Sequence, residues 1–71
     1  MRYAIVIEQG STSYGAYVPD LPGCVAAAET RDEVVRLIRE AIEGQIQMLR
    51  EDGQPVPEPR STAEYADVQV A

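Results

Sequence analysis

Short apolar stretches separated by polar turns open the chain. Residues 2–8, RYAIVIE, are apolar on both sides of an extended segment, which predicts a central strand covered on at least one side. Residues 14–18, YGAYV, predict a second strand, and the five-residue segment QGSTS at 9–13 suits an antiparallel hairpin. Residues 24–28, CVAAA, predict a third strand.

The segment PDLPG at 19–23 separates the second and third predicted strands. Pro22 restricts its own φ to about −65°, and Gly23 accepts a positive φ. These are the requirements at the two central positions of a type II turn, so we expect the chain to reverse direction here.

A helical pattern follows over residues 31–52. Thr30 and Glu33 form a capping box at its start, and Gly53 is a natural stop at its end. Gly44 is unusual inside a helix, where glycine costs about 1 kcal/mol relative to alanine, and we expect it to permit a close contact. The predicted buried stripe consists of Val34, Val35, Leu37, Ile38, Ala41, Ile42, Gln45 or Ile46, and Leu49.

The pattern of the C-terminal part predicts a stiff connector followed by one more strand. Residues 54–59, QPVPEP, are proline-rich, and residues 65–70, YADVQV, alternate apolar with polar side chains. The predicted fold is α+β with the order β-β-β-α-β: an antiparallel meander, one helix packed on one face, and a fourth strand at the edge. A right-handed crossover makes that strand parallel to the third and gives the sheet order 3-2-1-4. Because one helix covers only one face, we expect Val6, Ala4 or Tyr17 to leave an apolar patch on the other.

Composition narrows the class of protein. The chain has 71 residues and a net charge of −6 from twelve acids and six arginines, with one cysteine and no histidine. We expect a single domain over 1–71. We also expect self-association, because so short a chain has a small core and lacks a disulfide or a Cys/His zinc site to stabilise it. The acidity disfavours nucleic acid and suits a basic partner. The absence of a membrane-length apolar stretch or signal peptide, with one lone cysteine, predicts a cytoplasmic protein.

The side chains that could perform chemistry lack the necessary partners. Cys24 has no histidine or neighbouring base to activate it, so we interpret it as a small apolar residue. The hydroxyl cluster at 11–13 lacks a base as well. The acids considered for a magnesium site are Asp20, Glu29, Asp32 and Glu33. Capping and turn formation already explain most of them, so we predict no enzyme, no metal and no cofactor.

The chain resembles the HicB-like antitoxin family of bacterial toxin–antitoxin systems. The residues that carry the resemblance are Tyr3 with IVIE after it, AYVPDLPGC at 16–24, Thr30 to Glu33, EAIE at 40–43 and LREDGQPVPEP at 49–59. The resemblance implies a β-β-β-α-β domain with a cut-down ribonuclease H-like fold that lacks catalytic acids. It also implies a partner, a small basic HicA-type toxin that cleaves mRNA and carries a histidine. Many members continue into a DNA-binding domain, and we expect no such C-terminal domain here.

Three functions follow as hypotheses. The first is an antitoxin that masks a basic ribonuclease toxin. The second is a stand-alone homo-oligomeric module that binds a small ligand or serves as a scaffold. The third is a weak magnesium-dependent nuclease or hydrolase. The predicted partner-binding residues are Pro19, Asp20, Leu21, Pro22, Gly23 and Cys24, for which a purely structural turn is the alternative. Thr30 and Glu33 are predicted to cap the helix only.

Overall fold

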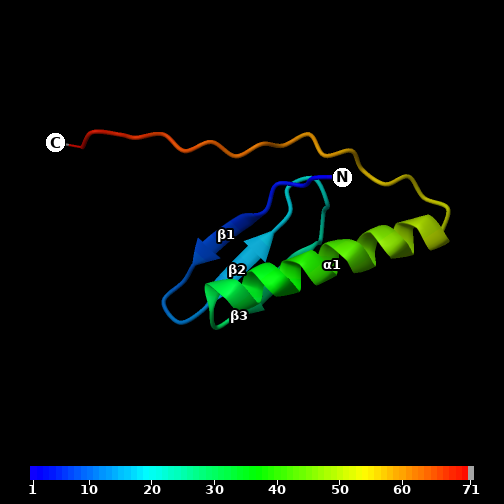
Figure 1. The fold of residues 1–71 in the computed structure, drawn as a ribbon, viewed down its shortest axis with the longest axis horizontal. Helices are drawn as coiled ribbons and strands as arrows, with labels where there is room; N and C mark the ends of the chain where they lie inside the picture. Colours follow the sequence, from blue (N-terminus) through cyan, green and yellow to red (C-terminus); the bar gives the residue numbers. More distant parts are fainter. Residues whose placement is uncertain (71) are drawn as a thin grey trace.

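The computed structural model describes residues 1–70, which contain three short strands and one long helix (Figure 1). The strands β1 (Val6–Gln9), β2 (Tyr14–Tyr17) and β3 (Val25–Ala28) form one antiparallel sheet in the order β1-β2-β3. The helix α1 (Arg31–Glu51) packs on β2 and β3. The predicted α+β class, meander and helix are confirmed, although each strand is shorter than its apolar pattern.

The register of the strands separates an inner from an outer sheet face. Ile7 pairs with Ala16, which pairs with Ala26, and these residues belong to the core beneath α1. The next row of paired residues consists of Val6, Tyr17 and Val25. In that row Tyr17 is 41% and Val25 66% exposed, so the expected apolar patch lies on the face that α1 leaves open.

The core is small and lies between the inner sheet face and the first half of α1. Leu21, Val34 and Ile38 have no exposed surface at all. The other buried members are Ala16, Val18 and Cys24. Leu21 comes from the loop between β2 and β3, so a loop side chain fills the space between sheet and helix.

Local signals define both ends of α1. The Thr30 hydroxyl accepts a hydrogen bond from the Glu33 N–H at 3.2 Å, and acidic residues occupy the first turn. At the other end Gly53 has a φ of 69°, which residues other than glycine rarely adopt. In the middle, a Cβ built on Gly44 would meet nothing within 4 Å, so the expected close contact is absent from the described residues of this chain.

The predicted fourth strand is not formed within the single chain. Residues 65–70 carry no strand assignment, and the observed sheet ends at β1 instead of continuing to a fourth strand. Tyr65 is 98%, Val68 76% and Val70 85% exposed. The segment extends past the sheet without pairing (Figure 1). The predicted strand is absent because alternation only makes a segment suitable for a strand. A strand also needs a neighbour for its backbone hydrogen bonds.

The two glycines of the helical region are expected to respond oppositely to alanine. Gly44→Ala should raise the free energy of unfolding by about 1 kcal/mol, because the position is helical and open. Gly53→Ala should lower it by about 1 kcal/mol, because alanine is strained at a φ of 69°. Urea denaturation of both variants measures the difference, and a destabilised Gly44→Ala variant would show that residue 44 packs against something.

Candidate interaction surface

Residues 18–24, hereafter the corner loop, fold into consecutive tight turns. The Leu21 N–H donates to the Val18 carbonyl, and the Cys24 N–H donates to the Leu21 carbonyl, both at 3.1 Å. Gly23 has a φ of 82°, so Pro22 and Gly23 occupy the central positions of the second turn, as predicted. The Val18 N–H closes the loop by donating to the Cys24 carbonyl at 3.2 Å.

The six residues predicted to bind a partner divide into two groups. Leu21 and Cys24 point inward and are buried in the core. Pro19, Pro22 and Gly23 are exposed, and therefore form the accessible surface of the corner loop. The sixth residue, Asp20, is half-buried, and its carboxylate is engaged by a distant part of the same chain.

Asp20 holds the start of the C-terminal segment. Its Oδ2 accepts hydrogen bonds from the Arg60 and Ser61 N–H groups, both at 2.8 Å, and its Oδ1 accepts one from the Ser61 hydroxyl at 2.9 Å. The backbone N–H of Ser61, followed by that of Arg60, holds the pKa of Asp20 below its ordinary value, because both stabilise the charged carboxylate. We call this arrangement the Asp20 latch.

Two further hydrogen bonds connect the corner loop and the N-terminus to the rest of the chain. The Tyr3 hydroxyl donates to the Pro57 carbonyl at 2.6 Å, and the Gln45 side-chain amide donates to the Pro22 carbonyl at 3.3 Å. Burial is the largest of the effects that raise the pKa of Tyr3, followed by the negative charges of Glu58 and Asp20. The corner loop is thus attached to α1 as well as to the C-terminal segment.

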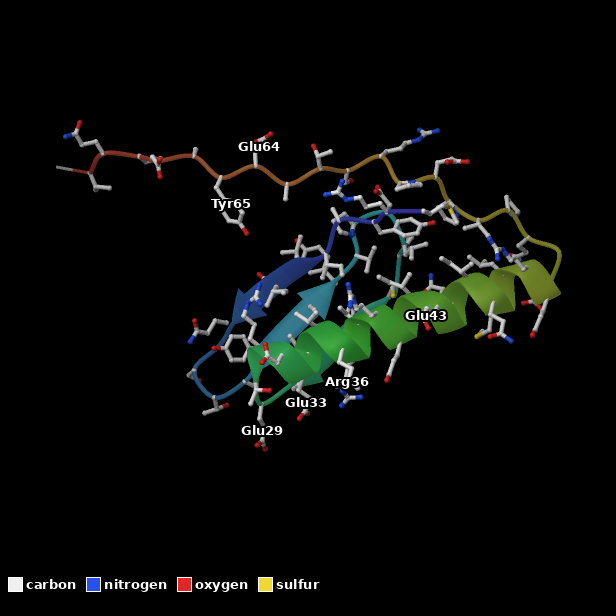
Figure 2. The ribbon with its side chains drawn as sticks, viewed as in Figure 1. Glu29, Glu33, Arg36, Glu43, Glu64 and Tyr65 are labelled. Carbon is white, nitrogen blue, oxygen red and sulfur yellow. The ribbon has the colours of Figure 1, made fainter. Side chains whose placement is uncertain are left out.

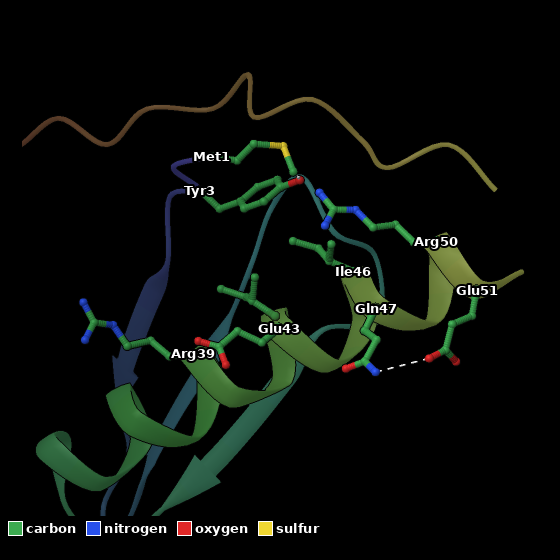
Figure 3. Close-up of a pocket in the computed structure, with 9 residues that line it drawn as sticks. Met1, Tyr3, Arg39, Glu43, Ile46, Gln47, Arg50 and Glu51 are labelled. Atoms are coloured by element: carbon green, nitrogen blue, oxygen red, sulfur yellow. Dashed lines mark hydrogen bonds between the residues drawn. The ribbon is translucent and has the colours of Figure 1, made fainter. Parts of the chain in front are cut away.

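A groove of about 740 Å³ lies between the N-terminus and the second half of α1 (Figure 3). Tyr3 forms one wall, and Ile42 and Ile46 supply apolar lining on the helix side. Arg39 and Arg50 also line the groove. The groove thus combines apolar side chains with charged ones of both signs, Arg39 and Arg50 beside Glu43 and Glu51.

Acidic side chains cover much of the remaining surface. Every acid of the chain is exposed except Asp20. Figure 2 shows Glu29, Glu33 and Glu43 projecting from the region of α1 and its approach, and Glu64 projecting from the C-terminal segment. Within residues 1–70 the only ion pair joins Arg36 to Glu40 at 3.2 Å, and both side chains are largely exposed. Such a pair contributes little stability. The six arginines are exposed too, so the surface carries both signs with an excess of negative charge, −6 in total.

Cys24 and the acidic side chains are the groups that the sequence offered for chemistry. Cys24 is buried, and burial raises the pKa of its thiol, which disfavours the nucleophilic thiolate. Residues 1–70 contain no group of three or more histidine, cysteine or acidic side chains placed to hold a metal ion. No helix in this part of the chain is long and apolar enough to cross a membrane.

No local sequence pattern indicates the Asp20 latch. Asp20 and Ser61 are forty-one positions apart, and an aspartate in a turn usually serves the turn itself. The sequence did not indicate the groove either, because its two sides, the N-terminal residues and the second half of α1, are about forty positions apart. The only sequence signal for the latch is the proline-rich connector, which brings residue 61 back along the molecule in an extended form.

Comparison with known proteins places the chain in a group of small prokaryotic and phage proteins. Residues 3–69 match the family described as "HicB_like antitoxin of bacterial toxin-antitoxin system". A "UPF0150 protein" of Archaeoglobus fulgidus is 40% identical over 57 residues, which covers 76% of this chain and 83% of that protein. No solved structure matches the chain.

Two longer relatives match along almost the whole chain. An uncharacterized 14.9 kDa protein from the rep-hol intergenic region of Haemophilus phage HP1 is 35% identical and covers 92% of this chain. "Antitoxin HicB 2" of Photorhabdus laumondii is 27% identical and covers 90%. The chain spans about half of each, 49% of the phage protein and 46% of the antitoxin.

Removing the charge of Asp20 should release the C-terminal segment. Asp20→Asn replaces one acceptor oxygen by an NH₂ group, so the amides of Arg60 and Ser61 should exchange with solvent faster, while the core amides are unchanged. Asp67→Asn, which changes an exposed acid by the same atoms, is the control. Hydrogen exchange measured by NMR separates the two, and equal rates at residues 60 and 61 in both variants would contradict the latch.

The same contact predicts a pH dependence. The pKa of Asp20 is lowered in the folded chain, so its contribution is fully present above the ordinary value of 3.8. That contribution is lost as the pH falls through the lowered value, because a protonated carboxyl no longer accepts all three hydrogen bonds. Amide exchange at residues 60 and 61, referenced to the core amides, should accelerate only in this acidic range. Acceleration beginning near neutral pH would contradict this assignment.

Proposed function

The chain belongs to the family of HicB-like antitoxins of bacterial toxin–antitoxin systems, and we propose that it neutralises a small basic toxin of the HicA type, an mRNA-cleaving ribonuclease. Family membership is the observation that carries this proposal. The relative named Antitoxin HicB 2 supports it. The function requires binding and no catalytic step, which agrees with a buried Cys24 thiol.

The proposed mechanism is masking of the toxin's RNA-binding surface. A net charge of −6 with almost all acids exposed favours fast association with a basic protein, because opposite potentials steer the two together. Once bound, the acidic surface repels RNA phosphates from the covered area. We assign the contact to the exposed part of the corner loop, Pro19, Pro22 and Gly23, because the Asp20 latch and the buried Leu21 keep this surface rigid.

The second candidate is a stand-alone homo-oligomeric module without a toxin. The exposed apolar side chains of Tyr65, Val68 and Val70 favour it, since a single chain leaves them in water.

We also propose that the domain has a partial ribonuclease H-like fold. The meander and crossover helix are compatible with it, and its fourth strand would need a pairing partner for residues 65–70.

Titration with the adjacent gene product tests the antitoxin function. If a small basic protein is encoded next to this chain, the purified chain should abolish its mRNA cleavage at equimolar amounts. The affinity should fall as salt is added, because screening weakens attraction between opposite charges. Undiminished cleavage by an active toxin at excess chain would contradict the proposal.

A pair of charge variants tests the contact surface. Pro19→Arg places a positive charge on the corner loop and should weaken toxin binding at least about tenfold, roughly 1.4 kcal/mol. Thr12→Arg makes the same change of net charge in the exposed hairpin loop at the other end of β2, and should change affinity much less. Calorimetric titration measures the affinity of both variants for the toxin, and thermal unfolding verifies that both are folded. Equal effects would remove the corner loop from the interface.

A further inference from the structure

The C-terminal residues 62–70, hereafter the tail, make up a segment with the properties of a strand and no partner. Residues 60 and 61 are fixed by the Asp20 latch, but no described hydrogen bond holds any residue beyond them. Tyr65, Val68 and Val70 are almost wholly in water. Glu64 and Tyr65 point to opposite sides of the tail, as successive residues of a strand do (Figure 2).

The outer edge of β1 has backbone N–H and C=O groups that no neighbouring strand of the described residues pairs with. The strand order β1-β2-β3 leaves one side of β1 unpaired, and an exposed edge of this kind is a template for an added strand. Ile7 of β1 belongs to the core side and Glu8 is exposed. A strand added there would have one apolar and one polar face, which is the pattern of Ala66, Val68 and Val70 against Asp67 and Gln69.

The chain's own tail is held away from this edge. A hollow of about 460 Å³ separates residues 2–5, which lead into β1, from residues 61–63. The latch fixes one side of the hollow, and Pro55, Pro57 and Pro59 keep the preceding connector extended. From there the tail runs outward, and the molecule reaches 52 Å in its longest dimension. The hollow lies beside the residues that lead into β1, and no described hydrogen bond joins the tail to β1 itself.

We propose that the tail of one copy pairs with the free edge of β1 in a second copy, and that the exchange is reciprocal. Each copy carries both the donor strand and the acceptor edge, so a two-fold arrangement satisfies both tails at once and closes without further growth. The exchanged strand completes the four-stranded sheet predicted from the sequence. This inference does not depend on the proposed antitoxin function.

The first test is the mass of the pure full-length protein without any toxin, by sedimentation over a range of concentrations. Wild type should form a dimer. Val68→Asp should raise the dissociation constant at least about tenfold by placing a charge on the buried face of the strand. Gln69→Asp makes the same change of net charge on the solvent face and should have little effect. Both positions are exposed in the single chain, so neither variant should disturb folding.

The second test shows which edge receives the tail. A nitroxide on Gln69→Cys of an unlabelled copy, mixed with ¹⁵N-labelled wild type, should broaden the amides of Val6–Gln9 in the wild-type copy; buried Cys24 should resist labelling. Monomeric wild type, association without broadening in the ¹⁵N-labelled copy, or broadening that is strongest at Val25–Ala28 of the other sheet edge would each overturn the proposal. Salt separates it from toxin binding: two acidic copies should associate no more weakly as salt rises.

Discussion

Burial of Leu21 beneath the corner loop is the interaction on which the rest of this structure depends. A core of six buried side chains has little redundancy, and Leu21 is one of the three with no exposed surface. Truncating such a residue costs about 2–5 kcal/mol, against a stability of about 5–15 kcal/mol for a typical domain. The turns around Pro22 and Gly23 therefore hold a core residue in position as well as reversing the chain.

The same loop joins the elements that a partner would meet. Its Asp20 carboxylate fixes residues 60 and 61, and its Pro22 carbonyl is bound by Gln45 of α1. The exposed side of the corner loop is therefore rigid, while the tail beyond the latch is unpaired. We infer that the two parts bind different partners: the rigid, acidic folded part binds a basic toxin, and the tail binds a second copy of the chain. Both interactions can exist in one molecule because they use different groups.

Local signals predicted most of the fold, and contacts between distant residues account for what was missed. Thr30 beside Glu33, and Pro22 beside Gly23, specify a cap and a turn through neighbouring atoms, so the sequence sufficed. The burial of Leu21 was not predicted, because a loop has no periodicity from which to infer it, whereas the burial of Cys24 agrees with its interpretation as a small apolar residue. The latch joins residues that are remote in sequence, so no local pattern indicates it. The alternation of residues 65–70 predicted a strand beside the first one, but alternation alone does not supply the pairing, which is absent from the sheet of the described residues.

The central claim is that the Asp20 latch fixes residues 60 and 61 but leaves the tail free to pair with another copy. Amide hydrogen exchange of wild type, followed residue by residue from dilute to concentrated solution, tests it most directly. The claim predicts protected amides at 60 and 61 at every concentration, and protection of alternate amides in 62–70 only as copies associate. Protection of 62–70 that is already complete in dilute solution would mean that the tail pairs with its own sheet, and would contradict the account.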